Sequence, residues 1–295
     1  MNDPVSTPDV DCAQRFMFED YGIRGEIVRL GSSLETILGQ HFYPAPVAGL
    51  LGEMLTASAL LSYTLKFDGS LSLQARSDGV VGLIFAECAN QKTLRGYARV
   101  NDEAMAEGVD QLLRGGTLAI TIMPDNGHHY QGIVPLDSSE LSACIEHYFE
   151  QSEQLPTALM LYSDGAQAAG VLIQALPKQA SNSDRLQENW QHVSSLLRTL
   201  TGEELLSVPF ETLLFRLFHQ EKVRLFEQRD LGFSCRCSMA RAEQAVRSIG
   251  ADEAQSVLEE KGEILIQCEF CQAEYRLVEG DMSRLFPAQD AGTLH

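Results

Sequence analysis

Four of the seven cysteines in this 295-residue chain form two close pairs near its C-terminal end. Cys235 and Cys237 lie in the stretch FSCRCSMA, and Cys268 and Cys271 lie in IQCEFCQAEY. Side chains two positions apart in an extended segment point to the same side, so Cys-Arg-Cys can present both sulfurs to one ion. Cys-Glu-Phe-Cys can do the same by folding into a tight turn. The two pairs therefore predict a shell of four thiolates around one metal ion.

Zinc is the metal that we expect at this site. All-sulfur ligation favours zinc or an iron–sulfur cluster over harder metals, and tetrahedral zinc has Zn–S distances of about 2.3 Å. A catalytic zinc normally keeps one open position and three protein ligands, whereas four cysteines close the shell. No His-Glu motif of a zinc hydrolase or deaminase accompanies the cluster. A structural or regulatory metal is thus favoured, and four ordinary reduced thiols are the simpler alternative.

Redox chemistry is the second possibility for the same four residues. The thiolate is the reactive form of cysteine, and a neighbouring thiol can resolve a sulfenic acid into a disulfide. Disulfide formation and zinc binding exclude each other, because both use the same sulfurs. The cluster could therefore act as a switch in which oxidation removes the metal.

The other three cysteines, Cys12, Cys88 and Cys144, are scattered along the chain. Cys88 follows the apolar run VVGLIFAE and Cys144 lies in a helical pattern, so we expect both to be packed as small hydrophobic side chains. A reducing compartment disfavours a permanent disulfide framework, and the count of seven is odd. The paired cysteines are therefore interpreted as metal ligands or redox-active thiols.

Composition restricts the partners. The chain has 41 Asp and Glu residues against 22 Lys and Arg residues, a net charge of −19, which disfavours binding to nucleic acid. The first twenty residues are not typical of a signal peptide, so we expect a cytoplasmic protein. Residues 47–65 approach the length of a membrane span but include Glu53 and several Ser and Thr residues, so a buried core helix is expected and no membrane.

Three hairpin patterns predict an antiparallel sheet in the first part of the chain. The turns are expected at Asp78-Gly79, at the stretch PDNG and at Asp164-Gly165, each between apolar runs. Helical patterns lie between these runs, at residues 45–66, at 102–114 and from Ser138, where serines could cap the first turn. The mixture predicts an α+β fold with an antiparallel-sheet core domain over residues 1–178.

A helical linker is expected at residues 179–231. Leu186, Trp190, Val193, Leu197 and Leu200 recur at helical spacing, and a second apolar stripe from Phe210 to Phe218 follows Pro209. Such stripes usually pack on a core and do nothing more. Because they directly precede the cysteine pairs, a second hypothesis is that they form a detachable cover over another apolar surface.

Residues 232–295 are expected to form a small C-terminal zinc-binding domain. Two short helical runs, SMARAEQAVRSIG and ADEAQSVLEEKG, end at glycines, and GEILIQCEFCQAEYRLV is typical of strand, cysteine turn and strand. A segment of this size with few large apolar side chains needs a metal to hold it together. Zinc contributes about 10–16 kcal/mol of apparent binding free energy to such domains, so oxidation should unfold the segment and release the stripes.

The run HQEKVRLFEQRDLGFSCRCSMARAEQAVRSIGADEAQSVLEEKGEILIQCEFCQAEYRL resembles the C-terminal part of the 33 kDa heat shock protein family, the redox-regulated holdase chaperones. GVLIQALP, at residues 170–177, resembles the end of the core domain in that family. The resemblance implies that Cys235, Cys237, Cys268 and Cys271 bind zinc when reduced. It also implies that oxidation forms the disulfides Cys235–Cys237 and Cys268–Cys271 and releases zinc.

The resemblance further implies a chaperone without enzymatic activity that binds unfolding client proteins without ATP and dimerises when activated. No phosphate-binding loop is present in the sequence, which agrees with an ATP-independent role. Two other function classes stay open: a static protein-interaction module whose zinc only holds the fold, and a dithiol oxidoreductase with thiols of low pKa.

Overall fold

The computed structural model describes residues 10–65, 68–101, 106–176 and 183–286. The chain forms two compact units, with the boundary between Ser234 and Cys235. We call the part up to Ser234 unit 1 and the part from Cys235 unit 2. The expected division into three parts, at 178 and 231, stays a prediction.

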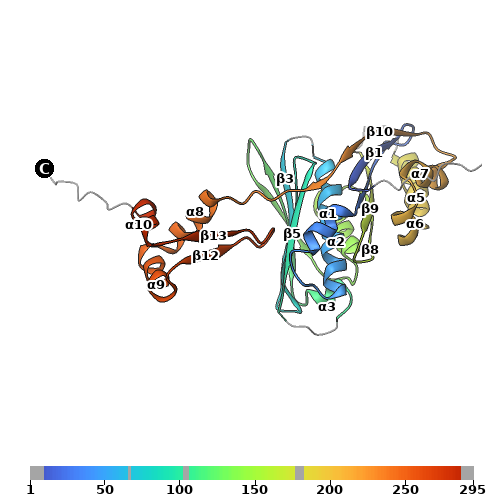
Figure 1. The fold of residues 1–295 in the computed structure, drawn as a ribbon. Coiled ribbons are helices and arrows are strands. Elements are labelled where there is room, and N and C mark those ends of the chain that lie inside the picture. Colours follow the sequence, from blue (N-terminus) through green and yellow to red (C-terminus); the bar gives the residue numbers. More distant parts are fainter. Residues whose placement is uncertain (1–9, 66–67, 102–105, 177–182, 287–295) are drawn as a thin grey trace, which may run out of the picture. The chain divides into compact units, whose positions relative to one another are not determined.

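Unit 1 contains two β-sheets (Figure 1). The first has five antiparallel strands in the order β10-β1-β2-β9-β8. Its strands are β1 (Cys12–Phe18), β2 (Ile23–Leu30), β8 (Thr157–Ser163), β9 (Ala168–Ala175) and β10 (Val223–Asp230). The edges of this sheet are thus β10 and β8.

The second sheet has six strands in the order β11-β5-β4-β3-β6-β7. Its strands are β3 (Gly69–Arg76), β4 (Val81–Ala89), β5 (Thr93–Val100), β6 (Thr117–Pro124), β7 (Tyr130–Pro135) and β11 (Gly232–Phe233). All pairings are antiparallel except that of β11 with β5. The three hairpins predicted from Asp-Gly and PDNG turns are confirmed as β3–β4, β6–β7 and β8–β9, and the α+β class is confirmed with them.

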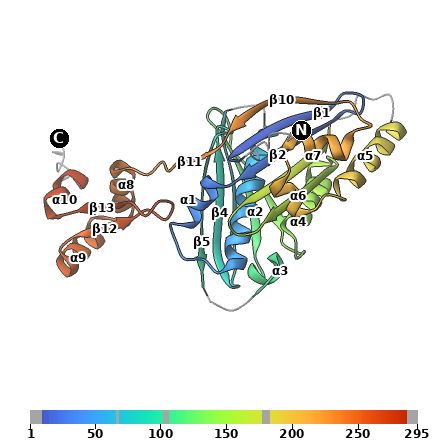
Figure 2. The ribbon, with the colours of Figure 1, turned by 45° about the vertical axis from the view of Figure 1, so that its right-hand side comes forward.

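Helix α2 (Ala45–Tyr63) lies between the two sheets and contacts strands of both (Figures 1 and 2). By length and composition it could cross a membrane, but 78% of its most apolar window is buried inside the protein. That burial supports the expected core helix. The first hydrophobic core surrounds α2 and includes α1 (Ser32–Leu38), α3 (Val109–Leu112) and α4 (Leu141–Tyr148), which continues into the π-helical turn η1 (Phe149–Glu153).

A second core lies on the opposite face of the five-stranded sheet. Along β2, Ile27 faces this second core and Val28 the first, because successive strand residues point to opposite faces. The helices α5 (Ser183–Leu197), α6 (Gly202–Ser207) and α7 (Phe210–Phe218) place most of the two predicted apolar stripes in it, but Leu186 is only partly buried and is not part of this core. Fully buried Arg29 of β2 reaches this layer and donates to the carbonyl oxygens of Leu205 and Val208.

Three sequence expectations differ from the structure. Residues 223–230, expected within the helical linker, form strand β10, which pairs with β1. The helix expected from Ser138 begins at Leu141, and no serine side chain caps it; the Ser138 hydroxyl accepts only the Glu140 N–H. In the segment 102–114 the structure has only the short helix α3, and residues 102–105 lie outside the described part of the chain.

Unit 2 is a small α+β unit. It contains α8 (Met239–Ile249), α9 (Ala251–Lys261), the hairpin of β12 (Ile264–Gln267) and β13 (Glu274–Leu277), and α10 (Glu279–Leu285). The helices predicted to end at glycines do so: Gly250 and Gly262 follow α8 and α9, and Gly262 has the left-handed φ of 76°. The hydrophobic cluster of unit 2 is formed by the buried residues Val246, Ala254, Leu258, Ile264, Leu277 and Leu285.

Candidate metal centre

Two irregular segments of unit 2 carry the paired cysteines. Cys235 and Cys237 lie in the extended stretch that precedes α8, whose first turn is capped by the Ser238 hydroxyl accepting the Arg241 N–H. Cys268 and Cys271 lie in the turn between β12 and β13. The geometry thus follows the sequence prediction of an extended pair and a turn pair.

Backbone hydrogen bonds fix the turn. The Cys268 N–H donates to the Ala273 carbonyl over 2.9 Å, and the Gln272 N–H donates back to the Cys268 carbonyl over 2.8 Å. Gln272 has a φ of 56°, so the chain passes through the left-handed region directly after Cys271. This local geometry turns the sulfurs of Cys268 and Cys271 toward one point.

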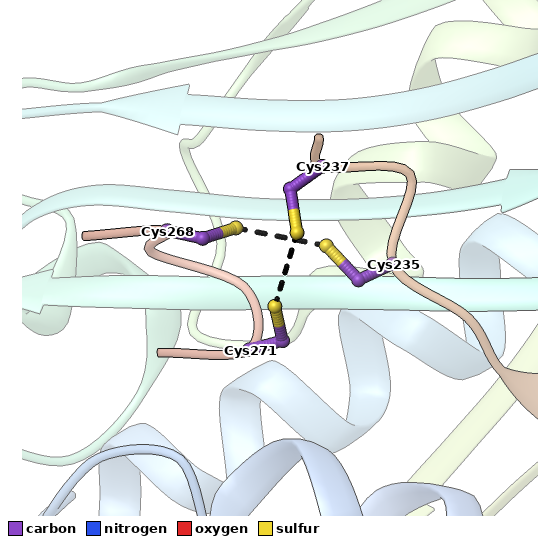
Figure 3. Close-up of side chains that lie close together, drawn as sticks. All are labelled: Cys235, Cys237, Cys268 and Cys271. Atoms are coloured by element: carbon purple, nitrogen blue, oxygen red, sulfur yellow. Dashed lines mark hydrogen bonds between the residues drawn. The ribbon is translucent and has the colours of Figure 1, made fainter. Parts of the chain in front are cut away.

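The four sulfur atoms converge (Figure 3). All lie within 4.8 Å of one another, and the nearest approaches are 3.6 Å for Cys235 with Cys268 and 3.3 Å for Cys237 with Cys271. Each residue is only partly buried. The structure therefore brings together all four predicted ligand residues.

The donor set fits zinc. Tetrahedral ligation with Zn–S distances of about 2.3 Å places neighbouring sulfurs about 3.8 Å apart. The distances of 3.3 and 3.6 Å between the nearest sulfurs, and the 4.8 Å limit on the rest, match such a shell with shifts of a few tenths of an ångström to about one. Four closely spaced sulfurs are also the donors that zinc or an iron–sulfur cluster prefers. Binding of zinc itself remains a prediction.

The four thiols do not have equal environments. The Tyr275 hydroxyl donates to the Cys237 sulfur over 3.0 Å, and this hydrogen bond lowers the pKa of Cys237 to about 7. Burial raises the pKa of Cys235 to about 12 and also raises that of Cys271. Cys237 therefore carries negative charge more readily than Cys235 or Cys271 before a metal binds.

Tyr275 is the residue near the cluster that sequence analysis missed. It lies on β13, four positions after Cys271, where pairing with β12 places it opposite Ile266. A tyrosine closely following a cysteine turn is a weak signal, because its contact depends on the register of the hairpin. Only the structure relates it to Cys237.

The remaining cysteines are buried and apart. Cys12, Cys88 and Cys144 are at most 3% exposed, as expected for packed thiols, and burial raises the pKa of Cys88 to about 11. Within the described ranges, the four cysteines of unit 2 are the one group of His, Cys, Asp or Glu side chains with metal-binding spacing.

Comparisons with known proteins agree with the arrangement of both units. The family model described as "Hsp33 protein" matches residues 11–278. The chain is 47% identical over 280 residues to the 33 kDa chaperonin of Ectopseudomonas mendocina, covering 94% of this chain and 95% of the relative. It is 45% identical over 293 residues to the 33 kDa chaperonin of Azotobacter vinelandii, covering 96% and 97%.

A solved structure gives the same fold. The crystal structure of the 33 kDa chaperonin from Thermotoga maritima superimposes with a TM-score of 0.80 at 21% identity, covering 93% of this chain and 97% of that one. At 21% identity this similarity supports a shared fold alone.

Proposed function

Because the chain belongs to the Hsp33 protein family, we propose that it is a molecular chaperone that holds unfolding proteins without ATP and is activated by oxidation. In this proposal the protein is not an enzyme. Its sensor is the cluster of Cys235, Cys237, Cys268 and Cys271, and its clients are unfolded or oxidatively damaged proteins. The convergence of four sulfurs in a unit with a very small core is the observation that carries the proposal.

Zinc bound by the four cysteines would supply the stability that unit 2 lacks. Its buried hydrophobic residues form one small cluster, and two of its helices are only eleven residues long. Structural zinc contributes about 10–16 kcal/mol of apparent binding free energy to metal-folded domains, which exceeds what so small a core supplies. The fold of unit 2 is therefore coupled to the reduced state of the thiols.

Peroxide is the oxidant class that we propose. A thiolate of each pair attacks peroxide and becomes a sulfenic acid with release of hydroxide, and the neighbouring thiol then displaces water to close the disulfide. Each pair loses two electrons to one peroxide, giving Cys235–Cys237 and Cys268–Cys271. Closing these bonds would leave none of the four residues as a thiolate to hold zinc, so unit 2 would lose the metal and with it its fold.

The covalent path from the sensor to unit 1 is short. Cys235 directly follows Ser234, whose N–H donates to the Leu94 carbonyl of β5 over 3.0 Å. Upstream, β10 lies on the edge of the five-stranded sheet and α5–α7 cover its second core. Unfolding that spreads back along this segment would uncover apolar side chains such as Phe210 and Phe218, which are the surfaces that bind unfolded proteins.

Location and assembly belong to the same proposal. A sensor that rests with four reduced cysteines needs a reducing compartment, so we place the protein in the cytoplasm. The activated protein is proposed to form a homodimer. The net charge of −19 disfavours nucleic acid as a partner.

A static interaction module is the alternative that one observation favours. Unit 2 has its own hydrophobic cluster and its own two-stranded sheet, so its metal could serve only to hold a permanent binding surface. In that case zinc would stay bound through mild oxidation, and client binding would not depend on the redox state.

Peptide mapping of the oxidised protein separates the two proposals. We expect peroxide at mildly raised temperature to convert the four thiols into Cys235–Cys237 and Cys268–Cys271, together with suppression of client aggregation. Cys235→Ser and Cys268→Ser should lose the switch, whereas Cys144→Ser, in unit 1, should keep it. Retention of all four thiols and of zinc while clients are already bound would contradict the redox proposal and support the static module.

A further inference from the structure

Strand β8 presents an open edge of the five-stranded sheet. In an antiparallel pair, alternate residues bond to the partner strand and the residues between them point outward. Backbone bonds from Ala175 to Pro156 and from Asp164 to Gln167 fix the even-numbered residues of β8 toward β9. The N–H and C=O groups of Leu159 and Leu161 therefore point away from the sheet.

The outward groups are only partly covered. The Leu159 N–H donates to the Glu146 carboxylate of α4 over 2.7 Å. Among the residues that the structure describes, the Leu161 N–H has no hydrogen-bond partner. An unpaired edge of this kind is a template for another extended chain.

A groove follows this edge. It has a volume of about 490 Å³ and is bounded by β8, the start of α4 and the C-terminal end of α5. Three carboxylates line it, those of Glu53, Glu140 and Glu146, against a single cation, Arg198. Glu53 has no hydrogen bond or ion pair within the described part of the chain. The apolar remainder of the lining includes Leu141, Met160, Leu161 and Leu197.

Arg198 connects this groove to the linker helices. Its guanidinium lies 3.1 Å from the carboxylate of Glu146, the same group that accepts the Leu159 N–H. The Arg198 side chain is 64% exposed, and ion pairs of such exposure contribute little to stability. Glu146 thus covers one edge amide, and its ion pair with Arg198, the residue directly after α5, holds it there only weakly.

We propose that the β8 edge is a client-binding site that adds an extended, basic and apolar segment of an unfolded protein as a further antiparallel or parallel strand. The outward backbone groups of Leu159 and Leu161 supply the strand pairing. The acidic lining selects Lys or Arg side chains, and the apolar lining takes the residues between them. This inference rests on the proposed chaperone function and names a client surface in addition to the apolar side chains that release of α5–α7 uncovers.

Release of α5 opens the site in this account. When the linker helices leave, Arg198 no longer holds Glu146 and the wall formed by Leu197 is removed. Glu146 can then rotate from the Leu159 N–H, and the strand edge becomes continuous from Leu159 to Leu161. Oxidised protein should bind an extended segment more tightly than reduced protein.

Fluorescence anisotropy with a synthetic peptide of alternating Val and Lys tests the inference. Leu161→Pro removes the outward N–H without breaking a bond to β9, since proline is tolerated where an edge N–H faces outward. Leu161→Val keeps that N–H and serves as the matched control. We expect Leu161→Pro to weaken peptide binding by the oxidised protein about tenfold, the equivalent of one to two backbone hydrogen bonds, and Leu161→Val to change it little.

Two further probes keep the result independent of how well the proline variant folds. N-methylation of alternate peptide amides removes the strand pairing but no side chain, so wild-type protein should lose most of its binding. Replacing each Lys of the peptide by Glu should weaken binding to wild-type protein more than to Glu140→Gln, which removes one carboxylate from the groove lining. Glu146→Ala should raise binding of a Val-Ser peptide by the reduced protein, and Glu146→Gln, which still accepts the Leu159 N–H, should not.

The outcomes separate this site from the chaperone proposal. Equal binding of the methylated and unmethylated peptides, or unchanged binding by Leu161→Pro, would overturn the β8 site while aggregation suppression could persist. Loss of aggregation suppression by wild-type protein with peptide binding intact would count against the chaperone proposal instead. If Leu161→Pro changes only the oligomeric state in sedimentation, the edge pairs two copies of this chain, and the client site is wrong.

Discussion

Unit 1 and unit 2 are stabilised in different ways. Unit 1 has two extensive hydrophobic cores, one on each face of the five-stranded sheet, and polar groups as large as Arg29 are buried in it with hydrogen-bond partners. Unit 2 has one small cluster and four converging sulfurs. This difference predicts that loss of the four-sulfur site would remove most of the stability of unit 2, whereas unit 1 would keep its first core even when the α5–α7 layer is released.

Loss of a cysteine ligand should have the largest effect on this contrast. Cys268→Ser replaces a thiolate by a weak ligand, so unit 2 should lose zinc and its helical signal, while unit 1 keeps a cooperative melting transition. The expected loss for unit 2 is several kcal/mol, because binding and folding are one event in metal-folded domains. Zinc analysis and circular dichroism measure it, with Cys144→Ser as control. Full zinc content in Cys268→Ser would contradict the ligand assignment.

Truncating a side chain of the second core should destabilise unit 1 and leave the zinc content of unit 2 unchanged. Phe218 is 2% exposed, and its ring meets the edge of Phe18 with centroids 4.9 Å apart. Phe218→Ala should destabilise unit 1 by about 3–5 kcal/mol through lost burial and a cavity. Denaturant titration gives this value, and the zinc content should be unchanged. The same substitution should weaken the packing of α7 and lower the oxidant dose that activates the protein. A loss of unfolding free energy below about 1 kcal/mol, instead of about 3–5 kcal/mol, would show that α7 is not an integral part of the core.

The free energy of unfolding of unit 1 should fall as pH rises, and the carboxyl group of Glu53 contributes to this decline. Burial, together with the nearby Glu140, raises the pKa of Glu53 to about 7 from its ordinary 4.5. The folded protein therefore binds this proton more tightly than the unfolded chain, and the stabilisation is present at low pH and lost between about pH 4.5 and 7. Glu53→Gln should flatten that decline by up to about 3 kcal/mol.

Denaturant titrations at several pH values measure this slope. Glu35→Gln, at an exposed position of α1, is the matched control for the same substitution. An identical pH dependence in Glu53→Gln and wild-type protein would mean that this carboxyl ionises normally in the fold.

The smallest effect is expected from Tyr275→Phe in unit 2. The variant keeps the ring and removes the hydroxyl that donates to the Cys237 sulfur. Mutating a hydrogen-bond partner of a metal ligand typically lowers metal affinity by about 10–100-fold. Because Tyr275 is partly exposed, we expect Tyr275→Phe to weaken zinc binding by less than about tenfold. Competition with a chromophoric chelator measures the change, and Tyr130→Phe in unit 1 is the control. Tighter zinc binding by Tyr275→Phe would contradict the role of this hydrogen bond.

The sequence predicts the site better than it predicts the first sheet. Cys235, Cys237, Cys268 and Cys271 could be placed together because extended and turn geometries are local, and the strands that flank the turn are short and near in sequence. The hairpins at Asp78-Gly79 and Asp164-Gly165 were predictable for the same reason. These features depend on residues that are close together in the sequence, so they can be predicted from it.

Strands β1, β2 and β10 were not predicted, because they are stabilised by contacts between residues that are far apart in the sequence. β2 carries Glu26 and Arg29 at fully buried positions, so its alternation does not stand out as apolar. β10 is a charged edge strand, VRLFEQRD, whose partner β1 lies about two hundred residues earlier. The hydrogen bond from Tyr275 likewise depends on hairpin register. Such pairings become visible only when the chain is folded.

Coupling between the four cysteines and client binding is measured by following zinc release and client aggregation in one cuvette. A chromophoric chelator reports zinc, and light scattering reports a chemically unfolded client, before and after peroxide at mildly raised temperature. We expect zinc to leave first and suppression of aggregation to rise with it. Zinc release with no gain in suppression, or full suppression by the zinc-bound protein, would contradict this coupling.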